Sequence, residues 1–311
     1  MAELSKGRPT VDEGPPDPEE LEASGRGSRS VISAATAMGA VHLTVSDLER
    51  SVAFYTQALG LGPLKRSKER ASLGASSREL LVLVEERGIR PAVGFTGLYH
   101  FALLVPERVE LARWLAHAFG DRVPLTGAAD HFVSEALYLS DPDGHGIEIY
   151  WDRPRELWEG QVGSRMTTMP LNLEDLMGDL RDAASKPFGG LPAGTVMGHV
   201  HLKVARIAET IAFYRDTLGF GLMAQLGSHA AFLSAGGYHH HLGANTWESA
   251  DALAAPTGFA RLIAAEIILP SQQELESARR RLTDDGRGPV PEGPTLTVLD
   301  PSGNNLVLKV A

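Results

Sequence analysis

One segment, Ala129 to Tyr150, holds side chains whose types and spacing could bind a metal ion; it is ADHFVSEALYLSDPDGHGIEIY. We predict two antiparallel strands here, because ALYLS and GIEIY alternate around apolar residues and DPDG is typical of a tight turn. Glu148 lies within the second strand between two isoleucines, where a carboxylate needs either water or a cation. His131 and Tyr138 precede the turn, and strand pairing could bring both onto the face of Glu148.

The order of these residues resembles the signature of the type I extradiol ring-cleavage dioxygenases, which belong to the vicinal oxygen chelate superfamily. The matching positions, at the family's spacing, are His131, Leu137, Tyr138, Asp141, Pro142, Gly144 and Glu148. The segment departs from the family's pattern at Ala129, where glycine or one of a few other residues is usual. A pattern of this length with one mismatch is a specific signal.

An internal duplication organises the chain around this segment. Phe54-Tyr55 recurs as Phe213-Tyr214, and the turn that begins at Asp141 recurs at Asp300, both after 159 residues. Each half divides again, because a second strand-and-helix pattern begins inside it. The resemblance implies an α+β fold of four β-α-β-β-β modules in two tandem halves, paired into two open barrel-like cups. Within the superfamily, the chain looks closest to the two-half bacterial catechol 2,3-dioxygenases.

The chain is predicted to have four parts. Residues 1–36 are rich in Pro, Glu, Ser and Gly, which favours a disordered tail. Residues 37–152 form the first half, with modules one and two, and residues 195–311 form the second, with modules three and four. Residues 153–194 are a linker with one helix, for which Asn172 is a plausible N-cap.

The resemblance also implies where metal ligands lie, since this superfamily places them on the first and last strands of a module. Three aligned positions hold a ligand-type residue in one module and an apolar residue in its counterpart: His199 and Ala40, His100 and Ala264, and Glu148 and Val307. Two histidines and one carboxylate form the facial triad that suits non-haem Fe(II), and Mn(II) shares these ligand preferences.

His100 and Glu148 come from module two and His199 from module three. We therefore predict that these two modules build the active cup, while modules one and four form a metal-free companion. Pairing only within each half would separate His199 from Glu148. The crossed pairing can occur within one chain or between the subunits of a dimer. The rival prediction takes His42, on the same strand face as Ala40, as the third ligand.

The run from Tyr238 to His241 is predicted to be the last strand of module three, and it resembles the double-histidine strand of extradiol dioxygenases. Alignment from Phe232 places the family's acid–base histidine at His240, with His239 and His241 on the opposite face. A slip of one residue would move the role to either neighbour.

The function implied by the resemblance is extradiol cleavage of a catechol-type aromatic diol by O₂ at Fe(II). His240 would exchange protons with the substrate, and His131 and Tyr138 would hydrogen-bond its oxygens. A glyoxalase-like lyase or isomerase would normally have a second glutamate where His240 lies. A metal-free binding protein would not need three ligand residues in register.

The remaining histidines are predicted to be structural: His42, His117, His145, His201 and His229. Trp247 could line a pocket for a ring-shaped substrate, or pack at an interface or in the core. The chain has 311 residues and no cysteine, which excludes disulfides and thiolate metal sites. Its net charge of −10 argues against nucleic acid and acidic membranes as partners. Without a membrane-length apolar run or a signal peptide, we expect a cytoplasmic protein, and the sequence leaves open whether it forms a homo-oligomer.

Overall fold

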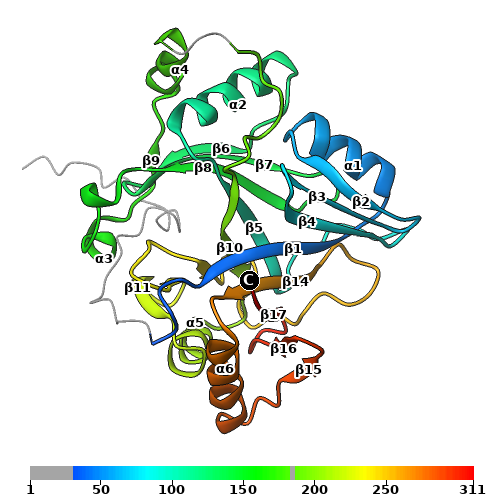
Figure 1. Ribbon diagram of the computed structural model, residues 1–311, viewed down its shortest axis with the longest axis vertical. Coiled ribbons are helices and arrows are strands. Elements are labelled where there is room, and N and C mark those ends of the chain that lie inside the picture. Colours follow the sequence, from blue (N-terminus) through cyan, green and yellow to red (C-terminus); the bar gives the residue numbers. More distant parts are fainter. Residues whose placement is uncertain (1–30, 183–185) are drawn as a thin grey trace, which may run out of the picture.

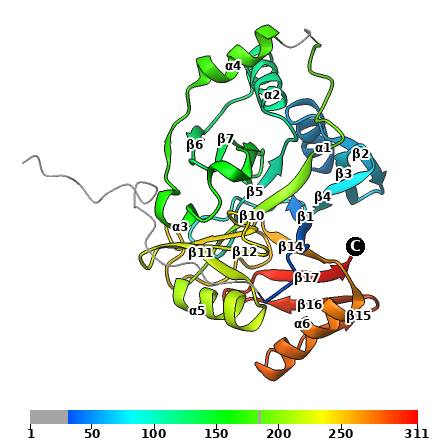
Figure 2. The ribbon, with the colours of Figure 1, turned by 60° about the vertical axis from the view of Figure 1, so that its left-hand side comes forward.

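The computed structural model describes residues 31–182 and 186–311, and within them the strands form two large sheets, one of eight strands and one of nine. Helices cover the outer sides of the sheets, with α2 and α4 together at one end of the molecule and α5 and α6 at the other (Figures 1 and 2). Among the described residues, no helix is long and apolar enough to cross a membrane.

Each module has the predicted order of one strand, one helical segment and three further strands. Module one contains β1 (Ala37–Val45), α1 (Leu48–Gln57), β2 (Gly62–Arg66), β3 (Arg70–Ala75) and β4 (Arg78–Glu85). Module two contains β5 (Gly97–Leu104), α2 (Arg108–Gly120), β6 (Gly127–Asp130), β7 (Ser134–Ser140) and β8 (Gly146–Asp152). The predicted α+β fold of tandem halves is confirmed.

The second half repeats this order, and the helix of module three passes from α-helical to π-helical geometry. Module three contains β10 (Val196–Lys203), α5 (Ile207–Ile211), the π-helical η3 (Ala212–Thr217), β11 (Gly221–Leu226), β12 (Ala230–Ser234) and β13 (Leu242–Asn245). Module four contains β14 (Leu262–Leu269), α6 (Gln272–Asp284), β15 (Val290–Glu292), β16 (Thr295–Leu299) and β17 (Asn305–Val310).

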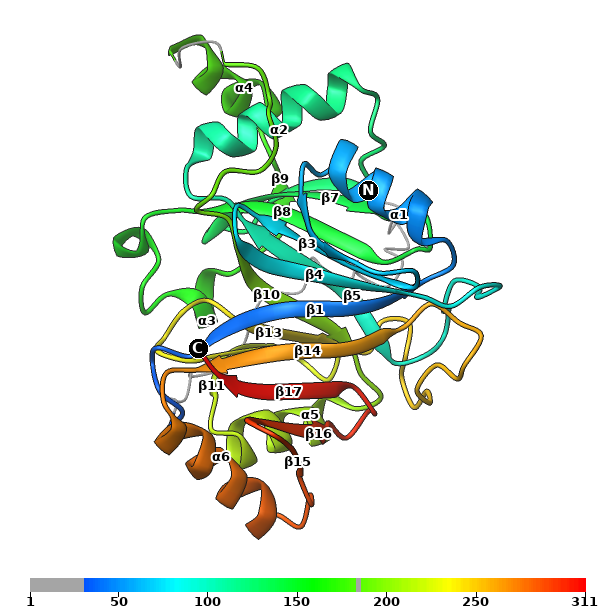
Figure 3. The same cartoon turned by 45° about the vertical axis from the view of Figure 1, so that its right-hand side comes forward.

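The modules pair across the halves rather than within them. One sheet has the order β15-β16-β17-β14-β1-β4-β3-β2 and joins modules four and one; Figure 3 shows β14 beside β1. The other has the order β11-β12-β13-β10-β5-β8-β7-β6-β9 and joins modules three and two. The predicted crossed pairing is therefore confirmed, and it occurs within one chain.

Buried hydrogen bonds also tie the two modules of each half together. The hydroxyl group of Tyr55, on α1, donates to Asp141 Oδ2 at 2.9 Å in the turn of module two. Tyr214 donates to Asp300 Oδ2 at 3.1 Å in the same way. All four residues are buried, so the duplicated Tyr and Asp positions anchor each helix to the neighbouring module's turn.

The linker adds η2 (Arg155–Leu157), α3 (Val162–Arg165), β9 (Met169–Pro170) and the predicted helix, α4 (Leu173–Asp182). Asn172 Oδ1 accepts the backbone N–H of Asp175 at 3.0 Å, as an N-cap does. The predicted disordered tail lies outside the described residues up to residue 30. Its described end, 31–36, contacts module three, where the backbone N–H groups of Val31 and Ile32 donate to the Gly219 carbonyl.

Candidate metal centre and substrate cavity

Three adjacent strands of the nine-stranded sheet, β10, β5 and β8, carry the predicted ligands. Ala102 on β5 is the register partner of His199 on β10 and of Glu148 on β8, so these two side chains flank a small residue. His100 lies two residues before Ala102 and therefore on the same face of the sheet. Because alanine leaves space above the middle strand, the three longer side chains can meet over it.

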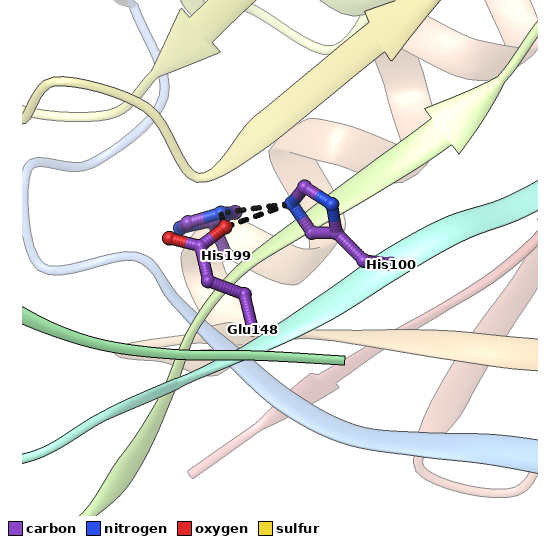
Figure 4. Close-up of side chains that lie close together, drawn as sticks. All are labelled: His100, Glu148 and His199. Carbon is purple, nitrogen blue, oxygen red and sulfur yellow. Dashed lines mark hydrogen bonds and ion pairs between the residues drawn. The ribbon is translucent and has the colours of Figure 1, made fainter. Parts of the chain in front are cut away.

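The three side chains converge on one buried point (Figure 4). Glu148 Oε2 lies 3.0 Å from His100 Nε2 and 3.1 Å from His199 Nε2, and the two nitrogens are 3.3 Å apart. None of these residues exposes more than 7% of its surface. The structure thus brings together all three predicted ligands, from modules two and three.

The ionisation of the cluster suits a cation. Burial alone would raise the pKa of Glu148, but the charges and hydrogen bonds of His199 and His100 lower it well below its ordinary value. Burial lowers the pKa of His199 to about 4. At neutral pH the cluster therefore offers a carboxylate and an imidazole lone pair, which are forms that bind metal ions.

The donor atoms lie close enough together to bind one ion. One ligand atom from each of the three residues lies within 4.8 Å of the others, and no other such group of His, Cys, Asp and Glu occurs in the described ranges 31–182 and 186–311. Two imidazoles and one carboxylate leave further coordination positions open, as in non-haem Fe(II) sites.

Tyr138 and His131 form a polar pair beside the cluster. Tyr138 on β7 is directly opposite Glu148 on β8 in the antiparallel register, which places both on one face. His131 lies between β6 and β7, and its Nε2 is 2.6 Å from the Tyr138 hydroxyl group. The predicted approach of these two residues to the face of Glu148 is therefore observed.

The histidine run of module three does not form the predicted strand. Tyr238 to His241 form an irregular connection, and the last strand, β13, begins at Leu242. Gly236 and Gly237 precede the run with φ values of 60° and 70°, a backbone conformation that favours glycine and that turns the chain before β13 can begin.

His240 nevertheless reaches the cluster of His100, Glu148 and His199. The centroid of its ring lies 4.1 Å from that of His199. His239 turns away toward Asp152, and His241 Nδ1 accepts the backbone N–H of Ala235. The three neighbouring histidines thus have different partners, and His240 is the one that lines the cavity.

A cavity of about 430 Å³ opens above the cluster. His100, Glu148 and His199 lie in its wall, together with further polar and aromatic side chains: His131, Tyr138, His201, Lys203, Phe232, His240, Trp247 and Glu248. Of the alternatives left open for Trp247, the structure shows that it lines the cavity while also packing against a buried hydrophobic cluster, and its ring contacts those of Tyr99 and His201. The cavity wall combines aromatic and polar side chains, as small-molecule sites do.

The rival ligand, His42, lies in the other sheet. Its Nε2–H donates to Glu266 Oε1 at 3.1 Å, and Lys309 Nζ lies 2.7 Å from Glu266 Oε2. Crossed pairing separates His42 from Glu148, so it cannot complete that cluster. Two other histidines bind backbone carbonyl groups: His145 Nε2 donates to Thr44 O, and His117 Nε2 to Gln57 O, both at 2.8 Å.

Sequence reasoning missed a polar network at the end of β8. Asp152 Oδ1 accepts His239 Nε2–H at 2.8 Å, and Asp152 Oδ2 accepts the Tyr238 hydroxyl group at 2.8 Å. The two-residue period of a strand could have placed Asp152 on the face of Glu148. The sequence carried no signal for its partners, because they lie on the irregular connection.

Comparison with known proteins decides the family. Two stretches of the sequence, residues 37–149 and 196–308, match the Glyoxalase/Bleomycin resistance protein/Dioxygenase superfamily. The chain belongs to this superfamily. The matched stretches correspond to the two duplicated halves, and the predicted membership is confirmed.

A curated relative and solved structures agree with this assignment. The chain is 41% identical over 257 residues to a protein of Bacillus subtilis named catechol-2,3-dioxygenase, an alignment that covers 81% of this chain and 89% of the relative. A putative dioxygenase from Bacillus subtilis superimposes with a TM-score of 0.62 at 13% identity, covering 91% of this chain and 86% of that one. Glyoxalase I from Zea mays superimposes with a TM-score of 0.52 at 17% identity, covering 88% and 92%. The two structural likenesses concern the fold alone.

Proposed function

We propose that the chain is an extradiol ring-cleavage dioxygenase that opens a catechol-type aromatic diol with O₂ at a non-haem Fe(II) ion. One observation carries this proposal: two imidazole nitrogens and one carboxylate oxygen converge beneath a cavity, and His240 and Tyr138 line the same cavity. The 41% identity to the Bacillus subtilis protein named catechol-2,3-dioxygenase supports it. Mn(II) shares the ligand preferences of Fe(II) and is the alternative ion.

His100, His199 and Glu148 would hold the ion. When bound, it supplies a common binding point for the diol and O₂ and a route for electron transfer between them. The protein shields this point from bulk solvent, because the three ligands are buried. Glu148 also lowers the charge that the ion brings into the apolar interior.

The other side chains would act on the substrate. His240 accepts a proton from a substrate hydroxyl group, since burial lowers its pKa and leaves the imidazole neutral. It returns a proton to oxygen as the O–O bond breaks. His131 Nδ1 donates to the Thr167 carbonyl group at 3.0 Å, so Nε2 of the neutral ring accepts the hydroxyl hydrogen of Tyr138 at 2.6 Å. The Tyr138 oxygen would then accept a hydrogen bond from a substrate hydroxyl group and orient it. The aromatic rings of Phe232 and Trp247 would orient the flat ring.

The test combines Fe(II) loading without oxygen, addition of catechol, and admission of air while the yellow ring-fission product is followed by absorbance. His240→Gln is measured beside the wild type at equal iron content. We expect product from the wild type and a loss of about 100-fold in kcat for the variant. A wild type that binds iron tightly but yields no product from any diol tested contradicts the proposal and favours a lyase or isomerase of this fold.

A further inference from the structure

Strand β8 presents three polar side chains on one face, Glu148, Tyr150 and Asp152, because they are two residues apart. Glu148 is one of the three candidate metal ligands. The ring of Tyr150 packs against His199, with centroids 4.9 Å apart. Asp152 lies at the end of the strand, and 20% of its side chain is exposed. One face of β8 thus carries Glu148 of the candidate ligand group at one position and the partly exposed carboxylate of Asp152 four residues later.

Two donors from the irregular connection fix the position of Asp152. His239 Nε2 and the Tyr238 hydroxyl group each lie 2.8 Å from one of its oxygens. Because the hydroxyl hydrogen of Tyr238 points to Asp152, Tyr150 must donate to the Tyr238 oxygen, at 2.7 Å. The carboxylate is therefore held from two sides and presents Oδ1 to His239.

These contacts determine which nitrogen atoms of the two histidines carry protons. A carboxylate accepts hydrogen bonds, so His239 Nε2 carries the proton. In the neutral ring, His239 Nδ1 is then an acceptor. His240 Nδ1 lies 2.8 Å from it and must donate. The proton of neutral His240 thus lies on Nδ1, and its Nε2 keeps a lone pair.

We propose that Asp152 and His239 are positioning residues that fix His240 as the Nδ1–H tautomer, so that Nε2 faces the substrate as a base. This inference rests on the proposed function for its consequence in catalysis. Asp152 and His239 do not line the cavity and act through His240.

The surroundings of the two histidines support this role. His239 is fully buried, and Trp158 packs edge-on against its ring with centroids 5.6 Å apart. His240 lines the cavity, and no group in residues 31–182 or 186–311 hydrogen-bonds its Nε2. The hydrogen bonds from Asp152 through His239 to His240 leave His240 Nε2 unprotonated, and this is the nitrogen atom available to a substrate.

The tautomer can be measured without metal. Long-range ¹H–¹⁵N spectra of the metal-free protein with ¹⁵N-labelled histidine separate Nδ1–H from Nε2–H rings, and His240→Gln assigns the signals of His240. We expect the Nδ1–H pattern in the wild type. His239→Phe keeps an aromatic ring but removes the acceptor, so the Nε2–H form of His240 should appear.

Kinetics with iron-loaded protein and catechol give the second readout. Asp152→Asn and His239→Phe should lower kcat by about 10- to 100-fold and change KM by less than about 2-fold, because they alter proton transfer and touch no substrate. Glu266→Gln is the control, since Glu266 forms a partly buried carboxylate–histidine pair with His42 in the companion cup. It should leave kcat unchanged.

The outcomes separate this inference from the proposed function. An Nε2–H His240 in the wild type, or an unchanged tautomer in both Asp152→Asn and His239→Phe, overturns the positioning role even if the enzyme opens catechol. An Nδ1–H tautomer that both variants disturb supports the positioning role even if no diol is cleaved, and in that case the proposed function fails alone. Asp152→Asn is nearly isosteric, so it provides the comparison if His239→Phe does not fold.

Discussion

His100 and His199 are 99 residues apart in the chain, yet their Nε2 atoms lie 3.3 Å apart across the junction of β5 and β10. This junction joins module two of the first half to module three of the second. Neither half can form the cluster alone, because His100 and Glu148 come from one half and His199 from the other. The candidate metal site therefore depends on the crossed pairing of modules two and three.

Gly198, next to His199, is predicted to tolerate no side chain. A Cβ atom there would collide with the Tyr150 hydroxyl group, which is buried and hydrogen-bonded to Tyr238. Gly198→Ala should lower the free energy of unfolding by about 1–3 kcal/mol and weaken metal binding, because β10 or Tyr150 must shift. Denaturant unfolding and a metal titration measure these effects. Gly120→Ala, at a helical position where an added Cβ meets nothing within 4 Å, is the control and should neither lower the free energy of unfolding nor weaken metal binding.

Glu266, in the sheet of modules one and four, should make the free energy of unfolding depend on pH in the acid range. Burial alone would raise its pKa, but hydrogen bonds from His42 and Lys309 lower it to about 2 from an ordinary 4.5. A lowered pKa stabilises the folded state above pH 4.5, and this contribution is lost as the pH falls toward 2. Glu266→Gln should therefore cost on the order of 2 kcal/mol at pH 7 and less at pH 3. An equal loss of unfolding free energy at both values would contradict this.

The duplicated tyrosines should contribute equally to stability. Tyr55→Phe and Tyr214→Phe each remove a buried donor and leave a carboxylate oxygen without it, on Asp141 and Asp300 respectively. Each change should lower the unfolding free energy by about 1–3 kcal/mol. Chemical denaturation of both variants tests the equivalence. A loss below about 0.5 kcal/mol in either would show that this anchor is not needed.

Much of this architecture follows from the sequence because the chain is duplicated. The offset of 159 residues aligns Ala40 with His199 and Val307 with Glu148, and such unequal pairs indicate that each half keeps part of a site. The candidate ligands were predictable because the chain resembles a superfamily that places them on the first and last strands of a module, and the repeat shows which of these positions hold a ligand-type residue.

The surroundings of His240 were not predictable in the same way. The order of strands in a module and the resemblance to the double-histidine strand predicted a strand for the histidine run, but the chain turns at Gly236 and Gly237 and β13 begins only at Leu242. The contact between Asp152 and His239 depends on the path of this irregular connection, which no strand period encodes. The pairing of β9 with β6 likewise depends on the linker's path through space.

The most direct test of the central claim compares His199→Ala with His42→Ala for iron content and for opening of catechol after anaerobic Fe(II) loading. The two histidines lie on equivalent first strands of different cups. A site shared by modules two and three predicts that His199→Ala loses iron and product, while His42→Ala keeps both. Loss of both in His42→Ala, with His199→Ala still active, would contradict the cross-half site.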